Sequence, residues 1–64
     1  MDNRELPIGL VMSLAMDNEA MMTYSNLSEE SRMQIVDYVS VPTRGNEGKY
    51  RIEEVINKLH NHMY

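Results

Sequence analysis

Residues 7–16 read PIGLVMSLAM, a run without a charged residue in a chain of 64 residues. The prediction of the fold starts from this run. Its apolar side chains recur every three or four residues, a spacing that places them on one face of an α-helix. That face comprises Ile8, Val11, Met12 and Ala15, and Leu10 and Leu14 widen it. A helix that is apolar on nearly every side is normally buried. We therefore predict a helix over residues 7–16 that is the central and most buried element of the fold.

A second helix is expected directly after the first, over residues 18–25. Asp17 and Asn18 both carry side-chain oxygens that can cap its first turn. We expect Asn26 to end this helix in a left-handed turn. The side chains expected to face inward are Ala20, Met21 and Tyr24. In the preceding helix, Gly9 and Ser13 are small and lie four residues apart, so a neighbouring helix is expected to approach closely there.

The clearest boundary in the chain is the sequence LSEE at residues 27–30. Ser28 is a good N-cap residue, and the two glutamates after it favour the first turn of a helix. We predict a third helix over residues 29–40, which Pro42 prevents from continuing and which leaves Val41 extended. Arg32, Ile35, Val36 and Val39 share one face, which is expected to pack inward with the Arg32 stem along its apolar rim.

A fourth helix is predicted over residues 46–60, where apolar side chains again recur at helical spacing. The positions concerned are Ile52, Val55, Ile56 and Leu59. Glu54 and Lys58 lie four residues apart on the opposite face, in the order that favours an ion pair. Residues 1–5 and 61–64 are expected to fray.

The pattern as a whole predicts an all-α fold, because no segment alternates polar and apolar residues as a strand does. We expect a compact bundle of four short helices that cross steeply, forming a single small domain over residues 1–64. The four helices are expected at roughly 7–16, 18–25, 29–40 and 46–60.

Composition narrows the classes of function. The chain has no cysteine, which excludes disulfides and thiolate metal sites, and it carries a net charge of −4, which disfavours phosphate-rich partners. Its first five residues lack the basic start of a signal peptide, and its longest wholly apolar stretch is far shorter than the roughly 20 residues that span a bilayer. We therefore expect a cytoplasmic protein that does not bind membranes.

Catalytic chemistry is not indicated. His60 and His62 are two residues apart, so on a helix they point about 200° apart and cannot hold one metal; we expect both to be solvated tail residues. The neighbouring glutamates diverge by about 100° on a helix, and the serines have no nearby base to activate them. The expectation is a protein that is not an enzyme and has no metal or cofactor.

Seven methionines give the chain an unusual set of apolar residues. Methionine fills irregular gaps in a core, but an exposed methionine patch also suits docking on a partner or on a second copy. We expect Met16 and Met22 to lie outside the core and Met12 and Met21 to lie within it. The candidate contact residues are Met12, Met16, Met21 and Met22. The leading hypothesis is thus a small acidic, non-enzymatic domain that acts through protein–protein contact.

A possible basic patch supports an alternative hypothesis, a helix-turn-helix-like regulator that binds nucleic acid. The residues concerned are Arg32, Arg44, Lys49 and Arg51. Glutamates are interspersed among them, and the predicted second helix has no basic residue. Nucleic acid is therefore the less favoured partner.

Two parts of the sequence together resemble a known family. Residues 6–20 read LPIGLVMSLAMDNEA, and residues 27–32 read LSEESR. This succession resembles short uncharacterised bacterial helical proteins and is similar to the C-terminal helical part of the YdeI/OmpD-associated, or bacteriocin-protection, family. The positions that match its Thr-Arg element and closing helix are Thr43-Arg44 and Arg51-Ile52-Glu53. The family's β-rich N-terminal portion has no counterpart in these residues, and GNEG at 45–48 interrupts its basic run. The resemblance implies an all-helical fold and no particular activity.

Overall fold

The computed structural model describes residues 6–42 and 44–64, and within them the chain forms four helices and no strand. These are α1 (Ile8–Ala15), α2 (Asn18–Asn26), α3 (Glu29–Ser40) and α4 (Glu47–His60). The predicted all-α fold is confirmed, and each helix begins and ends within one residue of its predicted bound. The expected fraying of residues 1–5 lies outside the described residues.

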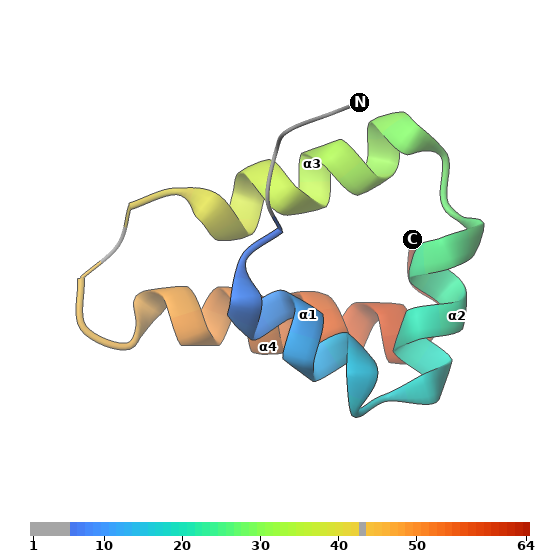
Figure 1. Cartoon of the computed structure of the whole chain (residues 1–64), viewed down its shortest axis with the longest axis horizontal. Coiled ribbons are helices and arrows are strands. Elements are labelled where there is room, and N and C mark those ends of the chain that lie inside the picture. The colour runs from blue at the N-terminus through green and yellow to red at the C-terminus, as the bar shows by residue number, and fades with distance from the viewer. Residues whose placement is uncertain (1–5, 43) are drawn as a thin grey trace.

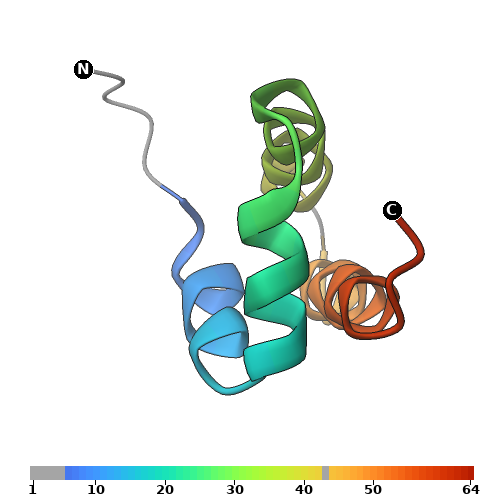
Figure 2. The same ribbon diagram turned by 90° about the vertical axis from the view of Figure 1, so that its right-hand side faces the viewer.

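Helix α4 is the central element of the fold, because α1, α2 and α3 all pack against it. Helices α3 and α4 run in opposite directions, and α2 crosses their ends steeply (Figure 1). A view turned by 90° places α1 and α4 on either side of α2, with α3 above them (Figure 2). The steep crossing that is expected of short helices is confirmed.

The hydrophobic core is formed by one face of each helix. Its buried members are Leu10, Leu14, Ala20, Ile35, Val36, Val39, Val55 and Leu59, with Tyr24, Leu27, Ile52 and Ile56 packed at its edge. The apolar faces predicted for α3 and α4 are thus the buried ones, and Arg32 is partly buried at the rim, as expected. Gly9 lets α4 approach α1, because a Cβ atom there would lie 2.9 Å from Ile52 Cδ1.

The prediction that the first helix is central is wrong. Leu10 and Leu14 are buried, but Ile8, Val11, Met12 and Ala15, the face expected to point inward, are exposed. A helix that is apolar all round does not specify which side packs inward. The buried side carries Leu10 and Leu14, and Gly9 beside them leaves room for the Ile52 side chain of α4.

The capping predictions for α2 and α3 are confirmed. The Asp17 carboxylate accepts a hydrogen bond from the Ala20 N–H at 3.0 Å, and the Ser28 hydroxyl accepts one from the Ser31 N–H at 3.2 Å. The left-handed turn expected at Asn26 is not found, because α2 includes this residue and the chain leaves it through an extended Leu27.

The end of the chain is folded back rather than frayed. His62 adopts a left-handed conformation with φ 56°, and the Met63 N–H donates to the Lys58 carbonyl at 2.9 Å. The His62 N–H donates to the Leu59 carbonyl at 3.1 Å, so the last turn of α4 is closed by backbone hydrogen bonds. This turn aims the His62 side chain back toward α2, where it makes two hydrogen bonds.

Candidate functional site

The most unusual surface of the protein is the side of α1 that faces away from the core. We call it the α1 outer face, and it consists of Ile8, Val11, Met12, Ala15 and Met16. Ile8 is 77% exposed, Met12 58% and Met16 85%. At 100° per residue these five positions cover about 140° of the helix, and none of them carries a charge or a hydrogen-bonding side chain. The outer face is therefore as apolar as the buried face of the same helix.

Exposed apolar residues on soluble proteins are usually scattered singly, whereas a continuous apolar stripe indicates a contact surface. The residues Ile8, Met12 and Met16 follow one another at intervals of four, so they form one ridge along the helix. Val11 and Ala15 form a second, lower ridge beside it. The arrangement offers a partner helix a ridge and a shallow groove, which is what helix packing requires.

The structure places all four candidate methionines on the surface. Met12, for which burial is predicted from sequence, is exposed with Met16 on α1, and Met21 and Met22 are exposed on α2. Thr23 takes the inward position expected for Met21, and its hydroxyl donates to the Glu19 carbonyl at 3.0 Å. Sequence reasoning selects only methionines for this surface. It misses Ile8 and Val11 because their spacing is also that of a core face.

The structure does not gather the four basic residues into one patch. The Arg32 guanidinium donates to the Ser25 carbonyl at 3.4 Å, at the start of α3. The Arg51 guanidinium donates to the Tyr38 carbonyl at 3.0 Å, near the other end of α3. Arg44 and Lys49 are exposed around the start of α4. Two of the four cations are thus held in contacts within the protein, at opposite ends of α3.

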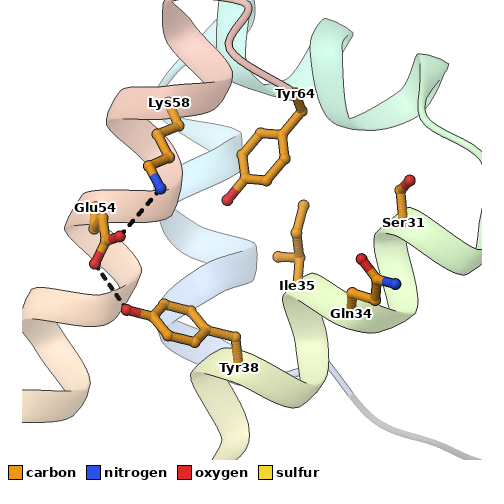
Figure 3. Close-up of a pocket in the computed structure, with 7 residues that line it drawn as sticks. All are labelled: Ser31, Gln34, Ile35, Tyr38, Glu54, Lys58 and Tyr64. Carbon is orange, nitrogen blue, oxygen red and sulfur yellow. Dashed lines mark hydrogen bonds and ion pairs between the residues drawn. The ribbon is translucent and has the colours of Figure 1, made fainter.

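A polar cluster spans α3 and α4 beside a hollow of about 220 Å³ (Figure 3). The Tyr38 hydroxyl donates to Glu54 at 2.8 Å, and Lys58 pairs with the other Glu54 oxygen at 3.3 Å, as its spacing predicted. The hydrogen bond raises the pKa of Tyr38 and lowers that of Glu54. Arg51 stacks on the Tyr38 ring, 4.8 Å from its centroid. The hollow is lined by Ser31, Gln34, Ile35, Tyr38, Glu54, Lys58 and Tyr64.

This cluster is suited to holding two helices together. A phenol that donates to a carboxylate stays protonated, and a carboxylate between a phenol and an ammonium stays ionised, so neither group is prepared to exchange a proton near neutral pH. Tyr64 reaches the hollow from the end of the chain, and partial burial raises its pKa (Figure 3). Apart from the Glu54–Lys58 pair, sequence reasoning misses these contacts, because they join residues from three separate segments.

Two histidines join the end of α4 to the start of α2. His60 Nδ1 lies 2.9 Å from Asp17 Oδ1 and 3.0 Å from Oδ2, and His62 Nε2 lies 2.9 Å from Glu19 Oε2. The Thr23 hydroxyl, which donates to a backbone carbonyl, lies 3.1 Å from His62 Nδ1. Both histidines are exposed, as expected, but they are not free tail residues, because each contacts a carboxylate of α2 or its N-cap. His62 adopts a left-handed conformation just after α4, and both histidines contact residues at the start of α2.

Protonated histidine strengthens this junction. The hydrogen bond and the negative charge of Asp17 raise the pKa of His60, and the same hydrogen bond lowers the pKa of Asp17. His60 lies at the negative end of α4 and Asp17 at the positive end of α2, which favours each of these two charges. Each histidine has a single carboxylate partner. Within residues 6–42 and 44–64, no three metal-ligating side chains are placed to share an ion.

No helix in the described part of the chain has the length and apolar character needed to cross a bilayer. Comparison with known proteins adds no relative: no family model matches the sequence, and neither a search of curated proteins nor one of solved structures finds a similar chain. The resemblance to the bacteriocin-protection family stays a prediction. Any conclusion about function therefore depends on the fold and on the α1 outer face.

Proposed function

We propose that this protein is a small acidic interaction domain, not an enzyme, and that it binds another protein through the α1 outer face. The observation that carries the proposal is the exposure of Ile8, Met12 and Met16 along one uncharged ridge. A folded chain gains nothing from keeping such a ridge in water, whereas burial of each side chain by a partner contributes about 1.5–3 kcal/mol before the costs of association.

The chemistry of the ridge fits this role. Methionine side chains are flexible and polarizable, so they adapt to a partner's shape at modest cost. Ala15, which has a small side chain beside the exposed Met12 and Met16, leaves room for a partner helix to come close. The remaining surface is rich in charged residues, and it supplies the polar rim that surrounds the apolar centre of a typical interface.

A protein partner is favoured over nucleic acid. Binding to a phosphate backbone requires several lysine or arginine side chains on one face that are not held in contacts within the protein. Arg32 and Arg51 instead donate to backbone carbonyls at opposite ends of α3, and the chain carries four more acidic than basic residues. The lack of cysteine suits a reducing compartment, so we place the protein in the cytoplasm as part of this proposal.

The proposal is tested by introducing a charge on the ridge and at a matched position elsewhere. Met12→Glu places a carboxylate in the middle of the α1 outer face, and Met63→Glu makes the same change at a similarly exposed methionine near the chain end. Both variants should keep the helical circular dichroism of the wild type. Proteins retained by immobilised wild type and Met63→Glu should be lost from Met12→Glu. Identical sets of bound proteins for all three would contradict the proposal.

A further inference from the structure

We propose that residues 61–64 form a strap that responds to pH. Protonated His62 holds the strap against α2, and loss of the ring proton releases it and withdraws Tyr64 from the hollow between α3 and α4. The strap shares no residue with the α1 outer face, so this inference is independent of the proposed function.

The hydrogen bonds of His62 require a proton on both ring nitrogens. His62 Nε2 lies 2.9 Å from Glu19 Oε2, and an ionised carboxylate can only accept. His62 Nδ1 lies 3.1 Å from the Thr23 hydroxyl. That hydroxyl has one hydrogen, which it donates to the Glu19 carbonyl at 3.0 Å, so it too can only accept from the ring. Two acceptors therefore face His62, and only the imidazolium form donates to both.

A neutral ring loses part of this arrangement. It has a single N–H, so its bare nitrogen faces either the Glu19 carboxylate or the Thr23 oxygen, and two acceptors do not bond. The Thr23 hydroxyl can restore the second contact only by turning its hydrogen away from the Glu19 carbonyl. Deprotonation also removes the charge attraction between His62 and Glu19. The contacts are therefore complete while His62 is protonated, and they weaken as rising pH removes the proton.

The backbone of the strap is strained where these contacts hold it. His62 has φ 56°, a left-handed conformation that is unfavourable for a residue with a side chain. The turn is closed by the Met63 N–H, which donates to the Lys58 carbonyl at 2.9 Å. Because the ring of His62 ties this strained turn to α2, loss of a ring contact favours an ordinary conformation at His62 and release of the residues after it.

Release of the strap opens the hollow between α3 and α4. Tyr64 follows His62 by two residues and lines the hollow together with Ile35 and Lys58 (Figure 3). Tyr64 is still 50% exposed there, so its packing alone is a weak attachment. The Lys58 ammonium pairs with Glu54 at the same hollow. The position of Tyr64 therefore depends on the contacts that His62 makes with α2.

The titratable groups that face the strap come from α2 and α4. Glu19 contacts His62 directly, and the neighbouring pair consists of Asp17 and His60. Helix α1 carries no titratable side chain, and Arg32 at the start of α3 donates to a backbone carbonyl near the end of α2. His60 belongs to α4 itself, so its pair with Asp17 holds the helix and not the strap.

Nuclear magnetic resonance of the whole protein tests the strap between about pH 5 and 8, where histidines ordinarily change charge. The probe is the Met63 amide, because its hydrogen bond closes the turn. After correction for the intrinsic effect of pH, its protection from exchange should fall about three- to tenfold as the pH rises. The Leu59 amide, inside α4, should keep its protection. Over the same range the Tyr64 ring-proton shifts should move toward those of an exposed tyrosine.

Two matched glutamine variants separate the strap from the rest of the junction. His62→Gln has no titratable ring in the strap, so the protection of the Met63 amide should no longer change with pH. His60→Gln removes a histidine from α4 but leaves the strap intact, so the Met63 amide should respond to pH as in the wild type. The same response in His62→Gln as in the wild type would overturn the proposal, and so would loss of the response in His60→Gln.

The requirement for two ring protons has its own test. Thr23→Val keeps nearly the volume of this buried side chain and removes the acceptor that faces His62 Nδ1. A neutral ring with its proton on Nε2 can then make every contact left to it, so the Met63 amide should respond less to pH than in the wild type. An unchanged response would overturn the requirement. Circular dichroism confirms that each variant is folded before its result is used.

Discussion

The orientation of α1 is the feature on which the interaction surface depends, and two alanine substitutions two residues apart test it. Leu10 is fully buried, whereas Ile8 is 77% exposed. Replacing a buried leucine by alanine removes its transfer free energy and leaves a cavity, at a cost of about 2–5 kcal/mol. A 64-residue domain has a free energy of unfolding of roughly 3–10 kcal/mol, so Leu10→Ala removes a large part of it.

The same calculation gives a much smaller effect at Ile8. Isoleucine to alanine removes apolar groups worth roughly 2.4 kcal/mol when fully buried, at about 0.8 kcal/mol each. Since only about a quarter of the side chain is covered, roughly 0.5 kcal/mol is lost. The higher helix propensity of alanine returns a similar amount, about 0.4 kcal/mol. Ile8→Ala should therefore change the stability of the monomer by less than about 0.5 kcal/mol.

Urea unfolding followed by far-ultraviolet circular dichroism measures both variants, at a concentration low enough to keep the chain monomeric. With a denaturant slope of about 1 kcal/mol per molar urea, Leu10→Ala should lower the midpoint by about 2 M or more, and Ile8→Ala should leave it nearly unchanged. If Leu10→Ala is unfolded without urea, Leu10→Val makes the same comparison with a smaller loss. An equal loss at both positions would refute the orientation of α1.

Three further predictions concern the caps, the histidine junction and the surface. Ser28→Ala should lower the free energy of unfolding by about 1 kcal/mol in a urea titration, because the first turn of α3 loses its cap; an unchanged midpoint would contradict this role. In the folded chain the pKa of His60 lies above its usual 6.5 and that of Asp17 below its usual 3.8, so their pairing is fully stabilising between these values. It is lost as the pH rises through the folded pKa of His60 or falls through that of Asp17. Asp17→Asn keeps a capping side chain but should flatten this pH dependence of the urea midpoint; an unaltered profile would show that the pair does not form. Finally, Met16→Glu combined with Met22→Glu should leave thermal unfolding intact and abolish association seen by light scattering, whereas unfolding of the variant would place these side chains in the core.

The parts of the fold that sequence predicts well are those in which local signals agree. In α3, Ser28 begins the helix, Pro42 limits it and its buried residues all lie on one side. In α4, the buried Val55 and Leu59 stand opposite a charged face, so the pattern permits one orientation. For α3 and α4, the sequence therefore predicts both that a helix forms and which side of it packs inward.

Helix α1 shows why the remainder is not predictable. Its sequence is apolar on every side, so its periodicity does not distinguish the buried Leu10 and Leu14 from the exposed Ile8 and Met12. Gly9 indicates where a neighbouring helix approaches, and the Ile52 side chain of α4 does lie against it, but this one position does not determine which of the flanking apolar residues become buried. The apolar residues from which we predict that α1 is buried are the same residues that form the surface proposed for binding.

The histidine junction escapes sequence reasoning for a different reason. His60 and Asp17 are 43 residues apart in sequence, and so are His62 and Glu19. Their meeting depends on the crossing of α2 over the end of α4 and on a left-handed turn at a residue that is not glycine. Neither feature has a local signature, so in sequence the two histidines resemble a solvated tail.

The central claim is that the α1 outer face is exposed in the single chain and is covered when a protein partner binds. Oxidation of individual methionines by dilute peroxide, followed by mass spectrometry, measures both properties in the purified protein and after addition of the proteins that immobilised wild type retains. We expect Met12 and Met16 to oxidise readily in the purified protein and to become protected when those proteins are added, while Met63 oxidises at the same rate throughout. Slow oxidation of Met12 and Met16 in dilute purified protein would contradict the exposed face, and equally rapid oxidation with the retained proteins present would contradict its role in binding.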